Sequence, residues 1–335
     1  MHLSLPLLGL AAQAGLSLAA PAPTLGNLDF PDPSITWDPQ TSAWYAFATQ
    51  GNGHNTQAAH SPSLHGPWTF LPHIDLLPVP GPWVDAVHPD IWAPDVRYLP
   101  ATDSFVLYYS GLHAASPYHC IGTATAPNIT GPYTAAAEPF ACPLADGGAI
   151  DASGFVDEAA RARYVVYKVD GSSKGAGGPC GNGDPPGLPT PIRLQQVDFR
   201  DGVTPVGEAT VILDRDPAVD GPLIEAPSLV KANGTYVLFY SSHCYNVPEY
   251  DVKYATAKEI TGPYKRQPEL MGKASDTFEL EATGGASSVA GGGTMVLHAN
   301  CPAGRCMYQT DFAVEDGLVV IADGNTAWTV HHGAA

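Results

Sequence analysis

The sequence is poor in basic residues. It contains 15 Lys and Arg against 33 Asp and Glu, which gives a formal net charge of −18 at pH 7. This charge argues against binding to nucleic acid or to an anionic membrane surface, because both would repel the chain. It suits a neutral or cationic partner, such as a polysaccharide.

Long apolar runs are also scarce. Outside residues 3–20, no stretch is long enough to span a bilayer. Residues 3–20 are rich in Leu and Ala and end in small residues at Ala19 and Ala20, which is typical of a secretory signal peptide, although no Lys or Arg precedes them. The sequence therefore predicts a signal peptide over 1–20 and a secreted, extracellular chain over 21–335.

The chain has no Cys-x-x-Cys pair, the spacing typical of many metal sites. Its six cysteines are even in number, which favours disulfides formed in an oxidising compartment. The pairs we expect are Cys301 with Cys306 and Cys120 with Cys142. The sequons at Asn128 and Asn233 predict a glycoprotein with its glycans on surface turns.

Helical periodicity is weak, and a pair of short apolar strands recurs instead. Ile-Glu-Ala-Pro-Ser-Leu-Val at 224–230 leads through an Asn-Gly turn into Tyr-Val-Leu-Phe-Tyr-Ser at 236–241. Similar pairs occur four more times, with second strands that start at 44, 105, 164, 236 and 295. The intervals are 61, 59, 72 and 59 residues, and such self-similarity predicts a repeat architecture.

A second series supports the repeat. Gly-Pro-Trp at 66–68 and Gly-Pro-Tyr at 131–133 and 262–264 are separated by 65 and 131 residues, about one and two periods. Five units of short strands predict an all-β fold, a five-bladed β-propeller in a single domain. The long interval contains a Gly/Pro-rich insertion at 171–190, which is either a loop that lines a site or a disordered excursion.

Four of the five units carry an acid near the start of the first strand. The acids lie 12, 10, 13 and 11 residues before the second strand: Asp32, Asp95, Asp151 and Glu225. If these strands are innermost, the acids converge on one end of a central channel, where like charges raise one another's pKa. Two carboxyl groups with separated pKa values are typical of a glycosidase, in which one protonates the leaving oxygen and the other activates water or attacks. A single Asp-Pro-Ser is also a common turn, so a catalytic role is indicated only by the recurrence of an acid at a similar place in four units.

The motifs around these acids resemble glycoside hydrolase family 43. They are Phe-Pro-Asp-Pro-Ser-Ile at 30–35, Trp-Ala-Pro-Asp-Val at 92–96, Ile-Asp-Ala-Ser at 150–153 and Ile-Glu-Ala-Pro-Ser-Leu at 224–229. The resemblance covers nearly the whole chain after residue 20. It implies inverting hydrolysis of arabinofuranosides or xylosides, with Asp32 as general base, Glu225 as general acid and Asp95 beside Glu225 to tune its pKa. Inversion requires the base and the acid to lie roughly 6.5–9.5 Å apart.

Other residues are candidates for binding. Trp92 is either a core residue or a wall that stacks on a sugar, and Asp151 and Arg193 are predicted to contact substrate. His298 follows an otherwise aromatic register and is either a hydrogen-bonded core residue or, as the resemblance implies, a neighbour of a calcium or sodium ion. Water would supply most ligands of such an ion, and no cofactor is expected for the chemistry.

The sequence thus predicts a secreted, monomeric, inverting glycosidase that degrades hemicellulose or other arabinose- or xylose-containing cell-wall polysaccharides. An α-L-arabinofuranosidase is the first choice, and an endo-1,5-α-L-arabinanase or a β-xylosidase is the alternative. A carbohydrate-binding propeller without catalysis would be expected to have lost Asp32 or Glu225. An invertase-type propeller is disfavoured, because the Arg-Asp-Pro at 215–217 lies too close to Glu225.

Overall fold

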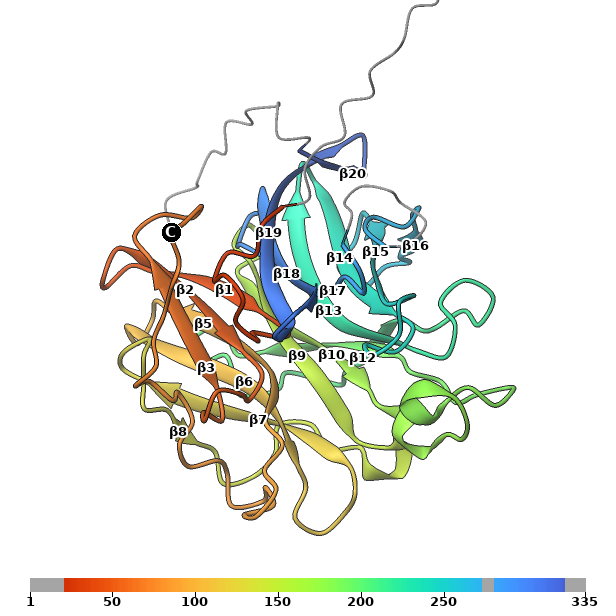
Figure 1. Cartoon of the computed structure of the whole chain (residues 1–335), viewed down its shortest axis with the longest axis horizontal. Helices are drawn as coiled ribbons and strands as arrows, with labels where there is room; N and C mark the ends of the chain where they lie inside the picture. The colour runs from red at the N-terminus through yellow and green to blue at the C-terminus, as the bar shows by residue number, and fades with distance from the viewer. Residues whose placement is uncertain (1–20, 273–279, 323–335) are drawn as a thin grey trace, which may run out of the picture.

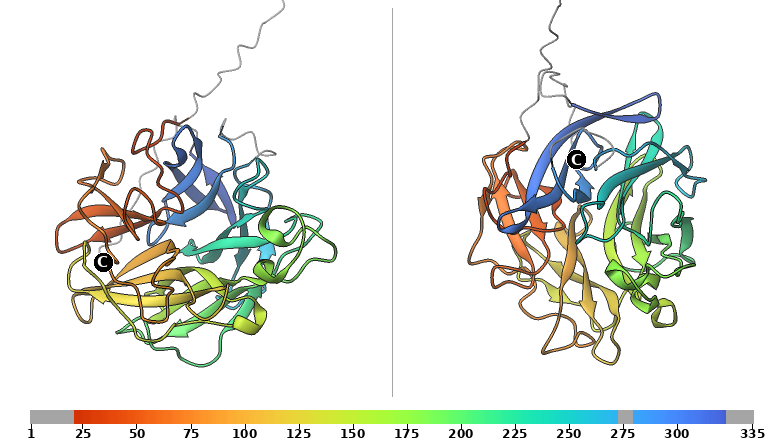
Figure 2. Two further views of the ribbon diagram at one scale, coloured as in Figure 1. Left: turned by 60° about the horizontal axis from the view of Figure 1, so that its bottom comes forward. Right: turned by 45° about the vertical axis from the view of Figure 1, so that its right-hand side comes forward.

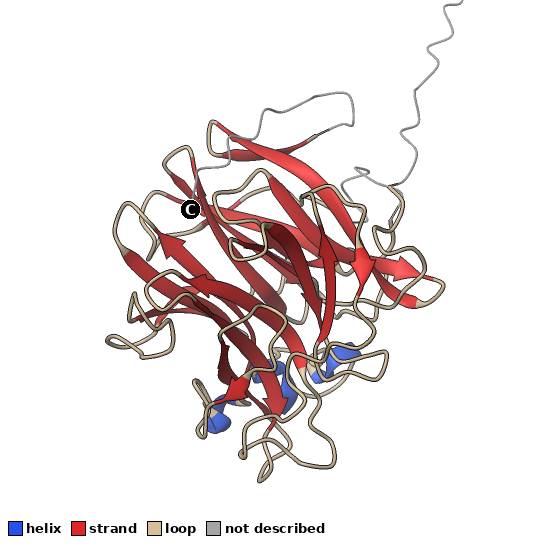
Figure 3. Ribbon diagram, turned by 90° about the vertical axis from the view of Figure 1, so that its left-hand side faces the viewer, coloured by secondary structure: helices blue, strands red, loops and turns tan. Residues whose placement is uncertain are grey.

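The structure, a computed structural model, describes residues 21–272 and 280–322 (Figure 1). The signal peptide predicted for 1–20 lies outside these residues. The described chain is almost wholly β, with three short 3-10 segments near one end of the molecule (Figure 3). These segments are η1 (Leu144–Asp146), η2 (Gly171–Lys174) and η3 (Pro179–Gly181). Within 21–272 and 280–322, no helix is long and apolar enough to cross a membrane.

In the described ranges, twenty strands form five antiparallel sheets of four strands each. Blade one contains β1 (Ser34–Asp38), β2 (Ala43–Ala48), β3 (Gln57–Ser61) and β4 (Thr69–Phe70). Blade two contains β5 (Trp92–Leu99), β6 (Ser104–Leu112), β7 (His119–Ala126) and β8 (Thr134–Ala135). Blade three contains β9 (Ala149–Asp157), β10 (Ala162–Val169), β11 (Ile192–Val197) and β12 (Thr210–Leu213). Blade four contains β13 (Ile224–Ala232), β14 (Thr235–Ser242), β15 (Asp251–Ala257) and β16 (Lys265–Arg266). Blade five contains β17 (Gly284–Ser288), β18 (Thr294–Cys301), β19 (Gly304–Glu315) and β20 (Leu318–Ile321).

The core is divided among the blade interfaces. Among the described residues there are five apolar clusters, and each joins two neighbouring blades. Phe47 and Phe105, for example, meet between blades one and two, and Val106 and Val165 meet between blades two and three. The second strands read as nearly continuous apolar runs because both of their faces are covered by adjacent blades. This arrangement confirms the predicted five-bladed β-propeller.

The ring closes between blades one and five, which lie side by side in Figure 2. The chain before β1 pairs with β19: the N–H of Thr24 donates to Met307 O at 2.9 Å, and that of Phe30 donates to Arg305 O at 2.8 Å. The first residues of the propeller therefore fasten its last blade, and they fix Asp32 beside Arg305.

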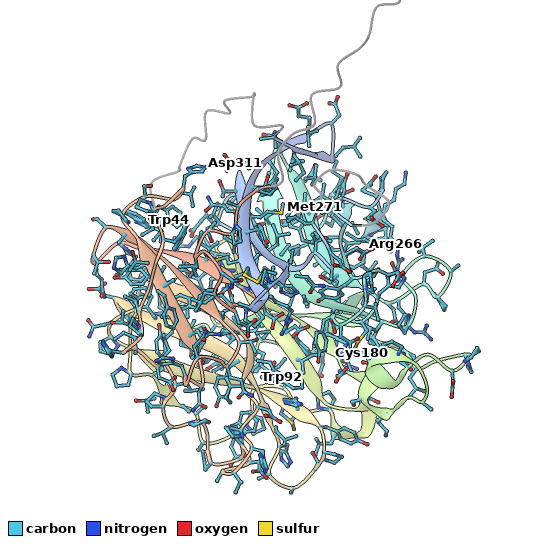
Figure 4. The ribbon with its side chains drawn as sticks, viewed as in Figure 1. Trp44, Trp92, Cys180, Arg266, Met271 and Asp311 are labelled. Carbon is cyan, nitrogen blue, oxygen red and sulfur yellow. A yellow bond between two sulfur atoms is a disulfide. The ribbon has the colours of Figure 1, made fainter. Side chains whose placement is uncertain are left out.

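Three disulfides are present. Cys120–Cys142 and Cys301–Cys306 are the two predicted pairs, and Cys180–Cys244 ties the 171–190 insertion to blade four. Figure 4 places Cys180 in this insertion, close to the coil of η3. The insertion is ordered, because the buried Asn182 bonds to Leu188 and Pro222. The alternative of a disordered excursion is therefore wrong.

Candidate active site

Three consecutive residues from each innermost strand line the central channel. The triplets are 32–34, 93–95, 151–153, 226–228 and 285–287. The first member of each has a positive φ between 43° and 61°: Asp32, Ala93, Asp151, Ala226 and Gly285. In blades two to five, the pairing with the second strand also shifts at this point. The positive-φ residue, with a bulge beside it in blades two to five, thus defines equivalent positions in the five blades.

This register corrects the predicted alignment of the acids. Asp32 and Asp151 both occupy the first channel position, whereas Asp95 occupies the third and Glu225 lies one residue before the first. Counting back from the second strand missed this difference because the bulges and turns vary in length. A shift of one residue changes the face to which a side chain points, so the four acids do not form one ring.

Asp95 belongs to a ring of small polar residues at the third channel position. The ring is buried and consists of Ser34, Asp95, Ser153, Ser228 and Ser287. Oδ2 of Asp95 accepts hydrogen bonds from Arg97 Nε at 2.8 Å and from the Gly154 N–H at 2.7 Å. Burial raises the pKa of Asp95, and Arg97 opposes that rise. Asp95 therefore interacts with Arg97 and with the backbone of blade three. The predicted place of Asp95 beside Glu225, where it would tune the pKa of that acid, is not what these contacts indicate.

Asp32 is held as a carboxylate. Its Oδ1 accepts from Arg305 Nη1 at 3.0 Å, and its Oδ2 accepts from Thr49 Oγ1 at 2.6 Å. Burial acts to raise the pKa of Asp32, but Arg305 and Thr49 bring it below its usual value. The side chain is buried apart from about a fifth of its surface and faces the channel. An ionised, channel-facing carboxylate of this kind can accept a proton from water.

His298 lies behind Asp32, fully buried and stacked on Tyr250. Burial lowers the pKa of His298 to about 3, so the ring is neutral. Its Nδ1 accepts the N–H of Asp32 at 3.0 Å, which leaves the ring hydrogen on Nε2. Nε2 has no hydrogen-bond partner among the described residues.

This tautomer does not fit direct binding of a cation. A metal ion needs a nitrogen lone pair, and the lone pair of Nδ1 is already used by Asp32. In the described ranges, no group of three or more His, Cys, Asp or Glu side chains is arranged to hold a metal ion. A calcium or sodium ion near His298 would therefore be held through water, and we assign it no part in the chemistry.

Asp151 and Glu225 are electrostatic neighbours across the interface of blades three and four. Oδ2 of Asp151 accepts the N–H of Ala226 at 2.9 Å, which places it beside Glu225. Burial and the Glu225 carboxylate raise the pKa of Asp151 to about 8, although Lys168 and the Ala226 N–H act against the rise. The pair therefore keeps a proton at neutral pH, and Asp151 is better placed than Asp95 to tune Glu225.

The raised pKa of Asp151 makes folding stability depend on pH. Between about pH 4 and pH 8 the folded state binds more protons at this site than the unfolded state does, so its contribution to stability is lost as the pH rises. In Asp151→Asn, the amide oxygen can still accept the Ala226 N–H, and the charge is absent. We expect the variant to melt about 2–4 °C above wild type at pH 8 and close to it at pH 4.5, measured by thermal unfolding. Asp146→Asn, at an exposed carboxyl, is the control; a lower melting point for Asp151→Asn at pH 8 would contradict the assignment.

Glu225 also contacts a lysine that the sequence analysis missed. Lys168 on β10 is almost fully buried, and its Nζ lies 3.1 Å from Glu225 Oε2 and 2.9 Å from Asp170 Oδ1. Thr49 and Arg305, which hold Asp32, were missed as well. The signal for Lys168 is a lone lysine in an apolar strand, Tyr-Val-Val-Tyr-Lys-Val; the signal for Arg305 is its place beside Cys306 in a disulfide-closed hairpin.

Trp92 and Arg193 differ in their relation to the channel. Trp92 precedes the first channel position of blade two, as Glu225 does in blade four, and one face of its ring stacks on His119 at 3.7 Å. The ring is half-buried, which leaves it placed to form a wall beside the channel. Arg193 lies two strands outward on β11, beside Asp146 at 3.8 Å, and is not among the residues that line the channel.

Comparison with known proteins identifies a family that matches most of the chain. The model of glycosyl hydrolases family 43 matches residues 23–315. A curated relative, arabinan endo-1,5-alpha-L-arabinosidase C of Emericella nidulans, is 34% identical over 99 residues. That match covers 29% of this chain and 29% of the relative, so less than a third of the relative's length is spanned.

Solved structures share the fold. A thermostable family-43 glycoside hydrolase has a TM-score of 0.71 at 21% identity, covering 91% of this chain and 95% of that one. An endo-1,4-beta-xylanase from Bacteroides thetaiotaomicron has a TM-score of 0.66 at 24% identity, covering 90% and 97%. An arabinanase of Bacillus subtilis has a TM-score of 0.62 at 21% identity, covering 87% and 96%.

Proposed function

Because the chain belongs to glycosyl hydrolases family 43, we propose that it hydrolyses α-L-arabinofuranosyl linkages in plant cell-wall polysaccharides with inversion. One observation carries the proposal: the surroundings of two carboxyl groups on one channel push their pKa values in opposite directions. The pKa of Asp32 is lowered, whereas that of Asp151, beside Glu225, is raised to about 8. An ionised base and a protonated acid, with pKa values separated in this way, are what a single displacement at an anomeric carbon requires.

Asp32 is the general base. Arg305 and Thr49 each bond to one of its oxygens and fix the plane of the carboxylate. It takes a proton from a water molecule that attacks the anomeric carbon from the face of blade one. Arg305 also stacks over the exposed ring of Tyr245 at 4.9 Å, which gives this side of the site an aromatic rim.

Glu225 is the general acid and Asp151 is its modulator. The proton that the pair keeps at neutral pH passes from Glu225 to the oxygen of the leaving sugar as the bond breaks. Asp151 is anchored by the Ala226 N–H, so its carboxyl group stays next to Glu225. Asp95 is outside this pair, and its role is to hold Arg97 and the start of blade three in the channel wall.

The net charge of the chain and its similarity to enzymes named for arabinan support a neutral polysaccharide as the substrate. A net charge of −18 disfavours anionic polymers and is compatible with neutral arabinan or arabinoxylan. Release of single arabinose units, as by an α-L-arabinofuranosidase, is the first choice. Internal cleavage of 1,5-linked arabinan is the second, favoured by the partial match to an endo-arabinanase. A β-xylosidase remains a third candidate.

The test is sugar release from linear arabinan, arabinoxylan and the p-nitrophenyl α-L-arabinofuranoside and β-D-xylopyranoside, with Glu225→Ala as control. Arabinose from wild type and none from the variant is the expected result. Oligosaccharides from linear arabinan would favour the endo-arabinanase, and xylose alone the β-xylosidase. Binding of polysaccharide without release of any sugar would contradict the proposed activity.

We also propose that the protein is a secreted, glycosylated monomer. Three disulfides among the described residues fit an oxidising compartment, and the sequon residues Asn128 and Asn233 are both exposed. N-terminal sequencing of protein from the medium is expected to begin close to residue 21. Glycosidase treatment is expected to lower its mass, and light scattering to give the mass of one chain.

A further inference from the structure

A buried cation touches the acid of the proposed site. Lys168 is 1% exposed, and its ammonium group donates to Glu225 Oε2 at 3.1 Å and Ser172 Oγ at 3.1 Å, with Asp170 Oδ1 at 2.9 Å. These three acceptors account for its three N–H groups. We propose that Lys168 is a positioning residue, which orients Glu225 and sets the upper pH limit at which the Asp151–Glu225 pair holds its proton. The proposal rests on the proposed function.

The local fold aims Lys168 at the next blade. The pairing of β9 with β10 shifts between Val166 and Lys168, and such a bulge turns the side chains that follow it. β10 packs against β13, where Glu225 lies. Ser172, in the first turn of the 171–190 insertion, also donates to Asp170 at 2.5 Å and so holds the second partner of the lysine. The insertion therefore supports Glu225 indirectly, through Ser172, Asp170 and Lys168.

The charge of Lys168 determines whether it helps or hinders the Asp151–Glu225 pair in keeping its proton. Burial acts to lower the pKa of Lys168, but Asp170, Glu225 and Asp151 raise it, so the ammonium is charged at every working pH. A fixed cation favours the ionised form of a neighbouring carboxyl and so works against retention of the proton. The titratable or charged groups that face the Asp151–Glu225 pair are Lys168 and Asp170 of blade three, Asp32 of blade one and Tyr250 of blade four.

Two variants are expected to shift the pH profile in opposite directions. Lys168→Met removes the cation, and the basic limb of kcat/KM should move up by about 1 pH unit while kcat at the optimum falls about tenfold. Asp170→Asn removes the competing anion, so the lysine acts more strongly on Glu225 and the limb should move down. A purely structural role predicts lower activity in both variants with an unmoved limb.

Lys231→Met is the matched control. Lys231 pairs with the buried Asp157 at 2.9 Å, near the other end of β13, and its loss should leave the limb in place. If Lys168→Met does not fold, the double variant Lys168→Met/Asp170→Asn, which removes one charge of each sign, is expected to show the upward shift. An unmoved limb in every folded variant of an active enzyme would overturn the role of Lys168 alone. An inactive wild type would instead contradict the proposed function.

Discussion

Replacing Glu225 by glutamine is expected to lower kcat/KM on arabinan by about 10³–10⁴-fold, because an amide cannot protonate the leaving sugar. The loss should be smaller, about 10–100-fold, on p-nitrophenyl α-L-arabinofuranoside, whose leaving group needs little protonation. Glutamine has the size of glutamate and can present its carbonyl oxygen to Lys168, which Glu225 contacts at 3.1 Å. The fold should therefore survive.

The two substrates measured side by side check this expectation. Glu208→Gln, at an exposed glutamate between β11 and β12, should behave as wild type on both. An equal loss on arabinan and on the aryl glycoside would show that Glu225 does not act as the acid. A thermal melt of each variant separates loss of chemistry from loss of folding.

Removal of the Asp32 carboxylate is expected to reduce kcat by about 10³–10⁴-fold on both substrates, since water must be activated whatever the leaving group. Asp32→Ala is a suitable change, although Asp32 has a positive φ of 52°. Alanine already occupies the equivalent position in two other blades, as Ala93 with φ 43° and Ala226 with φ 50°. The backbone of the variant should keep its shape.

Azide provides the decisive measurement for Asp32→Ala. The anion can enter the space left by the carboxylate and attack the anomeric carbon of the aryl glycoside, releasing the phenol and forming a glycosyl azide of inverted configuration. We expect azide to restore turnover in Asp32→Ala and not in Glu225→Gln. Rescue without inversion, or equal rescue of both variants, would contradict the assignment of Asp32 as base.

The repeat pattern was enough to predict the fold. Each blade needs a covered second strand, and such strands appear in sequence as apolar runs such as Phe-Val-Leu-Tyr at 105–108 or Tyr-Val-Leu-Phe at 236–239. The turns and the Gly-Pro series mark where each unit ends. The 72-residue interval was correctly attributed to the insertion, because blade three, which contains it between β10 and β11, keeps its four strands.

The site was less predictable, for reasons of register. Spacing identified Asp32 and Asp151, at the first channel position, and Glu225, one residue before it, but it also treated Asp95, at the third position, as their equivalent. A bulge shifts pairing by one residue without any mark in the sequence, so Asp95 could not be distinguished from Asp151. Blade five lacks an acid because a Cβ at Gly285 would lie 2.9 Å from His298 Nδ1.

The partners of the acids could not be predicted at all. Arg305 reaches Asp32 across 273 residues of sequence, and Lys168 reaches Glu225 from the neighbouring blade. These contacts depend on ring closure and on the packing between blades, which local patterns do not record. They nevertheless decide which carboxyl is ionised and which site keeps a proton.

The most direct test of the account is the configuration of the first product, followed by proton NMR during hydrolysis of p-nitrophenyl α-L-arabinofuranoside. The base and the protonated pair lie on different blades around one channel, as a single displacement by water requires. We therefore expect β-arabinofuranose to appear first and then to equilibrate with the other forms. Initial release of α-arabinofuranose would contradict it, because retention requires a covalent intermediate that this assignment of Asp32 and Glu225 does not provide.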